Sequence, residues 1–139
     1  MATRLTKGKA LIGQVRTSGA VRANTTTSKT TATTLTDATE TLTAAMVVTN
    51  GGLLVGTPTS TRTKTIPTGT LTCDALSGYV VGDTFEVSFT NLAAATHAFT
   101  VTAGVDATIV GSATVAAATS ATYKVRVSAT NTVVWYRVA

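Results

Sequence analysis

Alternation of apolar and polar side chains along the second half of the chain constrains its fold most. Aromatic and aliphatic residues alternate with polar ones in 85–89 and 123–127, and shorter segments of the same kind occupy 99–101, 108–110 and 133–138. A period of two places alternate side chains on opposite faces of a β-strand. Because glycine, asparagine and aspartate turn signals separate these segments, the pattern predicts several short strands of a sandwich or jelly roll.

The middle of the chain adds strands and two short helices. Residues 43–50 place a threonine before helix-forming residues and an Asn-Gly pair after them, which predicts one helical turn. An extended apolar segment begins at 53–55, and threonines alternate with other residues over 59–66. Pro67 is expected to end that strand, because proline cannot donate to a sheet ladder.

A second helix is predicted over residues 70–77. Leu71, Ala75 and Leu76 stand at helical spacing with Gly78 behind them, so we expect a short helix that lies over one end of the sheet. Two short helices cannot cover a sheet of this size, so a second sheet must do so. The predicted fold is therefore all-β: an antiparallel β-sandwich or jelly roll with one or two short helices and an N-terminal extended arm.

The composition describes an unusual surface. The chain of 139 residues contains 34 threonines, while only 12% of its residues are charged, about half the usual share. Threonine is β-branched and suits a pleated surface, and burying its hydroxyl against a partner costs far less than burying a charge. Such a surface is typical of a subunit that packs against other protein.

Positive charge is concentrated at the start of the chain. No acidic residue precedes Asp37, and the net charge of +5 comes mainly from this segment. Residues 17–36 are rich in Thr, Ser, Ala and Gly with little periodicity, which predicts an extended or mobile segment. We therefore divide the chain into a basic, weakly structured arm, residues 1–36, and a β-sandwich domain, residues 37–139. The basic residues of the arm are the candidate partner contacts: Arg4, Lys7, Lys9, Arg16, Arg22 and Lys29.

A basic arm of this kind can bind nucleic acid, bind an acidic protein surface or stay solvated. No aromatic residues are interleaved with the basic ones, and no nucleic-acid-reading motif is present. We therefore expect protein contact and no nucleic acid. Residues 1–15 hold no apolar run of signal-peptide length, and no stretch of the chain approaches the length of a membrane span, so we expect synthesis in the cytoplasm and no membrane contact.

No residue pattern indicates catalysis, a metal or a cofactor. Cys73 is the single cysteine and is expected to be a small buried residue. His97, the single histidine, is expected to be an ordinary turn residue, because one imidazole cannot supply a zinc ligand set. The six acids are scattered and lack calcium-loop spacing. Trp135 and Tyr136 are adjacent, so one of them should face outward, where an interface is a plausible place for it.

Six segments of the chain carry a resemblance to known proteins. They are Leu53-Leu54-Val55-Gly56-Thr57-Pro58, Arg62-Thr63-Lys64-Thr65-Ile66-Pro67, Val81-Gly82-Asp83-Thr84-Phe85-Glu86-Val87, Ile109-Val110-Gly111-Ser112-Ala113-Thr114-Val115, Tyr123-Lys124-Val125-Arg126-Val127 and Trp135-Tyr136-Arg137. These segments resemble small virion structural proteins of tailed bacteriophages, cyanophages and some large DNA viruses. The resemblance covers roughly residues 43–138 and leaves out the arm. Lys64 stands where such segments usually carry an apolar residue.

The resemblance implies a jelly-roll-like domain, usually trimeric, that decorates a capsid or sits on a tail appendage, and it supplies no catalytic residues. The preferred interpretation is a non-enzymatic capsid decoration, or cement, protein at the virion surface. Its partners would be copies of itself and the major capsid protein. The alternatives are a receptor-binding or structural module of a tail fibre or tip and, third, a minor glycan hydrolase with two facing carboxylates.

Overall fold

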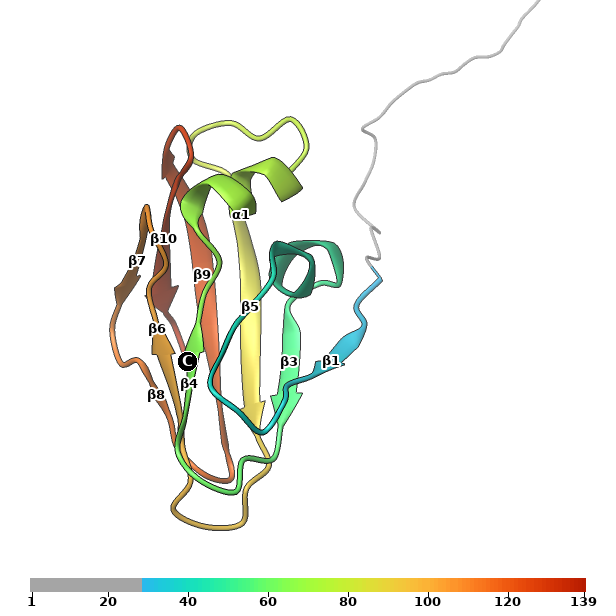
Figure 1. Cartoon of the computed structure of the whole chain (residues 1–139). Coiled ribbons are helices and arrows are strands. Elements are labelled where there is room, and N and C mark those ends of the chain that lie inside the picture. Colours follow the sequence, from blue (N-terminus) through green and yellow to red (C-terminus); the bar gives the residue numbers. More distant parts are fainter. Residues whose placement is uncertain (1–28) are drawn as a thin grey trace, which may run out of the picture.

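Two β-sheets packed face to face form the body of the protein (Figure 1). The computed structural model describes residues 29–139. The larger sheet, sheet A, has six strands in the spatial order β1 (Ala32–Thr34), β3 (Leu53–Gly56), β5 (Thr84–Asn91), β9 (Thr119–Ala129), β10 (Thr132–Arg137) and β7 (Ala107–Val110). The smaller sheet, sheet B, has four: β2 (Glu40–Thr41), β4 (Arg62–Thr65), β6 (Phe99–Thr102) and β8 (Thr114–Val115). The predicted all-β sandwich is confirmed.

The chain changes sheet at every connection between the described strands except the last. Strands β1 to β8 belong alternately to sheets A and B, and only β9 and β10 follow each other within one sheet. Five of the eight strand pairs are parallel: β1–β3, β3–β5, β2–β4, β4–β6 and β7–β10.

The predicted antiparallel pairing is correct for three strand pairs, β5–β9, β9–β10 and β6–β8, and wrong for the other five. The physical reason is that side chains alternate with a period of two in both kinds of strand, so the pattern does not report direction. A jelly-roll connectivity, which is built from antiparallel strands, is not confirmed.

Both predicted short helices are present, and α1 lies at one end of the sandwich, as expected (Figure 1). Helix η2 (Ala45–Thr49) is one turn of π-helix, and the predicted Thr43 hydroxyl accepts a hydrogen bond from the backbone N–H of Met46. Helix α1 (Gly69–Ala75) begins after Thr68, whose side chain accepts from the N–H of Leu71 at 3.1 Å. The first and last residues of both helices lie within two residues of the predicted limits.

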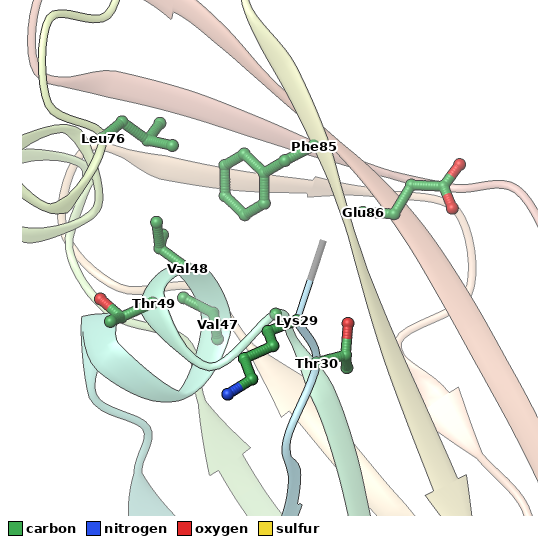
Figure 2. Close-up of a pocket in the computed structure, with 9 residues that line it drawn as sticks. Lys29, Thr30, Val47, Val48, Thr49, Leu76, Phe85 and Glu86 are labelled. Atoms are coloured by element: carbon green, nitrogen blue, oxygen red, sulfur yellow. The ribbon is translucent and has the colours of Figure 1, made fainter. Parts of the chain in front are cut away.

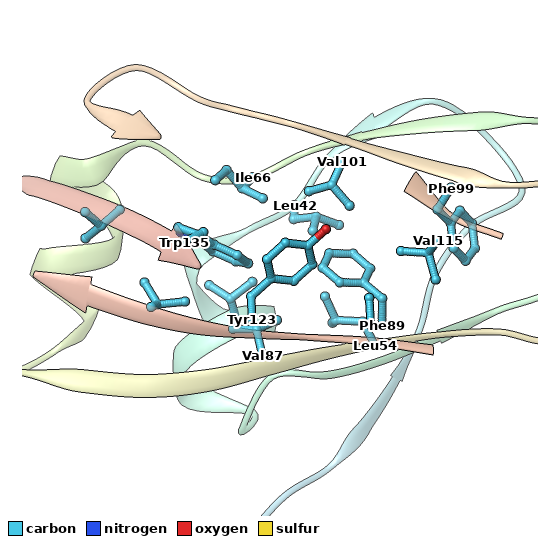
Figure 3. Packing of buried hydrophobic residues seen from close by; sticks show 14 of the residues in the cluster. Leu42, Leu54, Ile66, Val87, Phe89, Phe99, Val101, Val115, Tyr123 and Trp135 are labelled. Carbon is cyan, nitrogen blue, oxygen red and sulfur yellow. The ribbon is translucent and has the colours of Figure 1, made fainter. Parts of the chain in front are cut away.

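The core between the sheets contains the predicted inward residues. Alternate residues are buried over 87–91 of β5 and 121–127 of β9, Phe85 is partly buried, and Trp135 of β10 completes an aromatic row with Tyr123 and Phe89 (Figure 3). Adjacent rings of this row meet edge to face, with centroids 5.9 Å apart in both pairs. Trp135 is fully buried while its neighbour Tyr136 is exposed, which confirms the expected division between the two faces.

The last residues of the predicted arm contact the sandwich. Strand β1 pairs with β3 at the edge of sheet A, and Leu35 belongs to the core. The backbone N–H of Leu35 donates to Val55 at 2.7 Å. Residues 32–36 thus contribute to the sheet and the core, and residues 1–28 lie outside the described residues.

Candidate interaction surfaces

Only one of the candidate partner contacts lies in the described part of the chain. Lys29 is exposed at the point where the described chain begins. The other candidates lie outside the described residues: Arg4, Lys7, Lys9, Arg16 and Arg22.

Lys29 stands at the rim of a cavity of about 550 Å³ (Figure 2). Its wall is apolar where η2, the end of α1 and β5 meet, with Val48, Leu76 and Phe85 pointing toward one another. Glu86 lies on the rim beside β5. The arm therefore leaves the sandwich beside a hollow that has an apolar wall and a polar rim and reaches the C-terminal end of α1.

The outer side of sheet B is made of threonine alone. Lys64, Phe99, Val101 and Val115 are buried, so the residues that alternate with them face outward. Strand register places these threonines in adjacent pairs, Thr63 beside Thr100 and Thr65 beside Thr102, for example. All six outward residues of the four strands form this surface, here called the threonine face: Thr41, Thr63, Thr65, Thr100, Thr102 and Thr114.

Removing the threonine face from water requires little desolvation free energy. It contains no charge, and the hydroxyls of Thr65 and Thr102 hydrogen-bond to each other at 2.9 Å, so part of their bonding capacity is already satisfied. The outer side of sheet A differs, because Glu86 and Lys124 form an ion pair there at 3.4 Å and Arg126 lies close by. Of the two outer sides, that of sheet B is the better suited to burial.

A second surface lies at the end of the sandwich that carries α1. Loop 76–83 packs on the β9–β10 turn, where Tyr79 and Asn131 exchange hydrogen bonds of 3.2 and 3.3 Å. The turn between β6 and β7 joins the same end, because Val105 accepts from the N–H of Gly69 at 2.8 Å. Four large apolar side chains at this end, here called the α1 end, are more than half exposed: Leu71, Val80, Val81 and Val105.

Helix α1 lies over one end of the sandwich, as predicted, with Leu76 packed against the core, and a close backbone contact holds it there (Figure 1). A side chain at Gly69 would meet the backbone oxygens of Asp106 and Asn131 at 2.3 Å, so only glycine fits there. Thr72 and Cys73 are buried beneath the helix, while Leu71 is exposed. Leu71 therefore points away from the sheets, because the close contact at Gly69 fixes the rotation of the helix.

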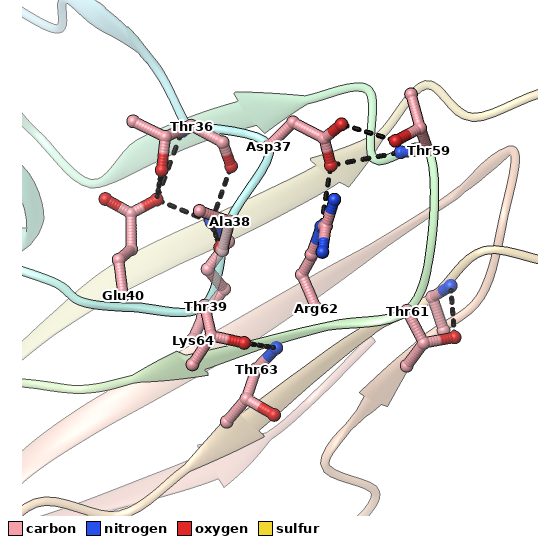
Figure 4. A network of polar contacts seen from close by, with 11 residues as sticks. Thr36, Asp37, Ala38, Thr39, Glu40, Thr59, Thr61, Arg62, Thr63 and Lys64 are labelled. Carbon is pink, nitrogen blue, oxygen red and sulfur yellow. Dashed lines mark hydrogen bonds and ion pairs between the residues drawn. The ribbon is translucent and has the colours of Figure 1, made fainter.

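A buried lysine anchors the base of the arm (Figure 4). The Lys64 side chain is fully buried on the inner side of β4. Its ammonium group donates to the backbone oxygens of Thr36 and Ala38 at 2.7 and 2.8 Å and to the Glu40 carboxylate at 2.5 Å. The ring of Phe99 lies on another side, 5.4 Å from the ammonium to the ring centroid. A charge needs such a set of partners to be tolerated in a core.

A second ion pair, between Asp37 and Arg62, holds the base of the arm to the connection between β3 and β4 (Figure 4). The Asp37 carboxylate accepts from the Arg62 guanidinium at 2.8 Å and from the hydroxyl and N–H of Thr59 at 2.6 and 3.1 Å. Residues 36–40 are thus fixed between two buried leucines, Leu35 and Leu42. The arm is attached to a rigid base.

Both carboxylates of this network have lowered pKa values. Hydrogen bonds from Arg62 and Thr59 lower the pKa of Asp37 far below its usual range. Partial burial acts to raise the pKa of Glu40, but hydrogen bonds from Lys64 and Thr36 and the charge of Lys64 outweigh it, so that this pKa is lowered as well. Both groups favour the folded state in their ionised form.

The stability of the sandwich is therefore expected to fall with pH in acid. The folded-state pKa values of Asp37 and Glu40 lie below the unfolded ones. The stability that their ionised carboxylates contribute is therefore complete above the ordinary carboxyl pKa of about 4, and it is lost as the pH falls toward the folded-state pKa values. Urea unfolding between pH 7 and pH 2 measures it. The variant Asp37→Asn with Glu40→Gln should show a shallower decline, and an equal decline in both proteins would contradict this assignment.

The remaining residues considered for chemistry lie apart. Cys73 is buried under α1, and burial raises the pKa of its thiol, which disfavours the reactive thiolate. His97 lies in the turn between β5 and β6. Within residues 29–139 no group of three or more histidine, cysteine, aspartate or glutamate side chains is placed to hold a metal ion. No helix in that range has the length and apolar character needed to cross a membrane.

Comparisons with protein-family models, with curated proteins and with solved structures found no match to the chain.

Proposed function

We propose that the protein is a non-enzymatic structural subunit of a virion, which decorates and stabilises a capsid as a homo-oligomer. The observation that carries the proposal is the threonine face. An entire outer sheet surface without charge favours burial against another protein, because few water-bound charges must be stripped on association. The resemblance of residues 43–138 to virion proteins supplies the biological setting and the preference for a trimer.

In this proposal the two surfaces have different roles. Copies associate through their threonine faces into a closed ring, since closed symmetry satisfies every copy of a repeated interface. The α1 end and the basic arm contact the major capsid protein. Binding to the assembled shell in preference to its precursor stabilises the assembled shell by linkage.

The capsid role is preferred to that of a receptor-binding module on a tail. Such a module would present aromatic side chains at its loop tips. Among the described aromatic residues Tyr136 is exposed, and it lies within β10 rather than in a loop. Quantitative mass spectrometry of virus particles separates the two roles, because decoration requires many more copies per particle than a tail appendage does.

A charge placed on the threonine face tests the self-association. Thr100→Lys puts an ammonium group in the middle of this face, and Thr90→Lys puts one on the outer side of sheet A as the matched control. We expect sedimentation to find an oligomer, most simply a trimer, for the unchanged protein and for Thr90→Lys. The Thr100→Lys variant should be a monomer. A monomeric unchanged protein at high concentration would overturn the proposal.

Removal of residues 1–28 tests the arm. Since β1 and the Lys64 network lie after this segment, the truncated protein should keep its fold but load poorly onto capsids of its own virus. Circular dichroism checks the fold, and co-sedimentation with capsids measures loading. Full loading by the truncated protein would remove the arm from the mechanism.

A further inference from the structure

The acidic residues of the sandwich are unevenly paired. Three of the six acids form ion pairs with other described residues, and they lie along the two sheets: Asp37, Glu40 and Glu86. The other three, for which the described residues provide no ion pair, all belong to the α1 end: Asp74, Asp83 and Asp106. The α1 end therefore combines unpaired negative charge with exposed apolar side chains.

The chain itself contains a segment of matching chemistry. Residues 1–28 carry five basic side chains and no acid. Apolar residues are interspersed among them, and Leu11, Ile12 and Val15 stand close together between Lys9 and Arg16. A segment that is both basic and apolar complements a surface that is both acidic and apolar.

The arm leaves the sandwich close to the α1 end, so residues 1–28 can reach that surface. Lys29 lines the same cavity as Leu76 and Phe85, and this cavity extends to the C-terminal end of α1 (Figure 2). Twenty-eight extended residues span up to about 90 Å, whereas β9, the longest strand, spans about 37 Å with its 11 residues. The reach is ample, and a tethered segment binds its own domain at a high effective concentration.

We propose that residues 1–28 dock on the α1 end of their own chain. The basic side chains pair with Asp74, Asp83 and Asp106, and the apolar residues between them cover the exposed valines and Leu71. The free subunit thereby shields its own apolar surface. Under the proposed capsid role, an acidic shell surface would compete for the arm and release the α1 end for contact, but the docking itself does not depend on that role.

Zero-length cross-linking of the full-length protein tests this docking. A carbodiimide joins lysine amines to carboxylates only where they touch, and Lys7 and Lys9 are the lysines of residues 1–28. Peptide mass spectrometry should find them linked to Asp74, Asp83 and Asp106, and about tenfold less to Glu86, which is an exposed carboxylate on sheet A with 58% of its side chain accessible. Equal linking to Glu86, or no link to the three aspartates, would overturn the proposal.

Isotope mixing and two valine variants complete the test. In an equal mixture of heavy and light protein, unfolded and refolded together, the links should join residues of one copy and stay unmixed; mixed heavy–light links approaching about half of the total, the share that random pairing of copies gives, would show docking on a neighbour and refute the proposal. Val81→Ser at the α1 end should lower the yield about tenfold, whereas Val138→Ser, at a position with the same 55% exposure on the outer side of sheet A, should leave it unchanged. Equal yields in the two variants would exclude an apolar contribution from this surface.

Discussion

Replacement of Trp135 with alanine is expected to lower the free energy of unfolding by about 4 kcal/mol, as for other large aromatic side chains removed from a core. Trp135 is fully buried and packs edge to face on Tyr123, which packs on Phe89 in turn (Figure 3). Its indole Nε1 has no hydrogen-bond partner among the described residues, so the loss reflects apolar contacts alone. For a domain of ordinary stability this is a large part of the total.

Tyr136 provides the matched control for this prediction. It is the next residue of β10 and points to the opposite side, where it is exposed. Tyr136→Ala is expected to change the free energy of unfolding by only about 0.5 kcal/mol. Urea unfolding of the two variants measures both effects, and similar losses would show that the core is not arranged around Trp135.

Replacement of Glu40 with alanine is expected to cost about 3 kcal/mol, because it leaves the buried ammonium of Lys64 without its carboxylate. The two backbone oxygens that also accept from Lys64 remain, but they carry no full charge. The loss should be seen in urea unfolding near neutral pH. It should also loosen residues 36–40, which faster amide hydrogen exchange in that segment would report.

A double variant separates the buried charge from the shape of the site. Lys64→Met with Glu40→Leu removes both charges and fills a similar volume with apolar atoms, so it should be more stable than Glu40→Ala alone. Thr36 and Ala38 are exposed, and water can take over their backbone oxygens. A double variant less stable than Glu40→Ala would mean that the ion pair contributes more than it costs.

The sequence predicts the strands of this protein well where apolar and polar residues alternate in a simple way. Phe89 and Tyr123 are examples, because burial of one side of a strand leaves a direct record in the sequence. The direction of the strands leaves no such record, and the parallel pairing of β3 with β5 depends on connections that cross between sheets. Lys64 was equally unpredictable, because its burial requires carbonyl groups from a segment more than twenty residues earlier.

The candidate surfaces were predictable in kind but not in place. The abundance of threonine indicated a surface suited to contact with protein, yet only the register of β4 with β6 brings Thr63 beside Thr100. The apolar α1 end could not be foreseen, since its exposed residues come from a helix and two loops that meet only in the folded chain. Leu71 is exposed although it shares helical spacing with Leu76, because helical spacing alone does not fix how a helix is rotated.

The alternation of the chain between two sheets also determines when the domain can form. Neighbours within a sheet are distant in sequence, as Leu53 is from Ser88, and the hairpin of β9 and β10 is the one local strand pair among the described residues. Such a topology folds slowly, because long loops must close, with a loss of chain entropy, before the stabilising contacts between distant strands can form. Since β9 also pairs with β5 in the middle of sheet A, the nascent chain cannot complete this sheet until residues 119–137 have left the ribosome.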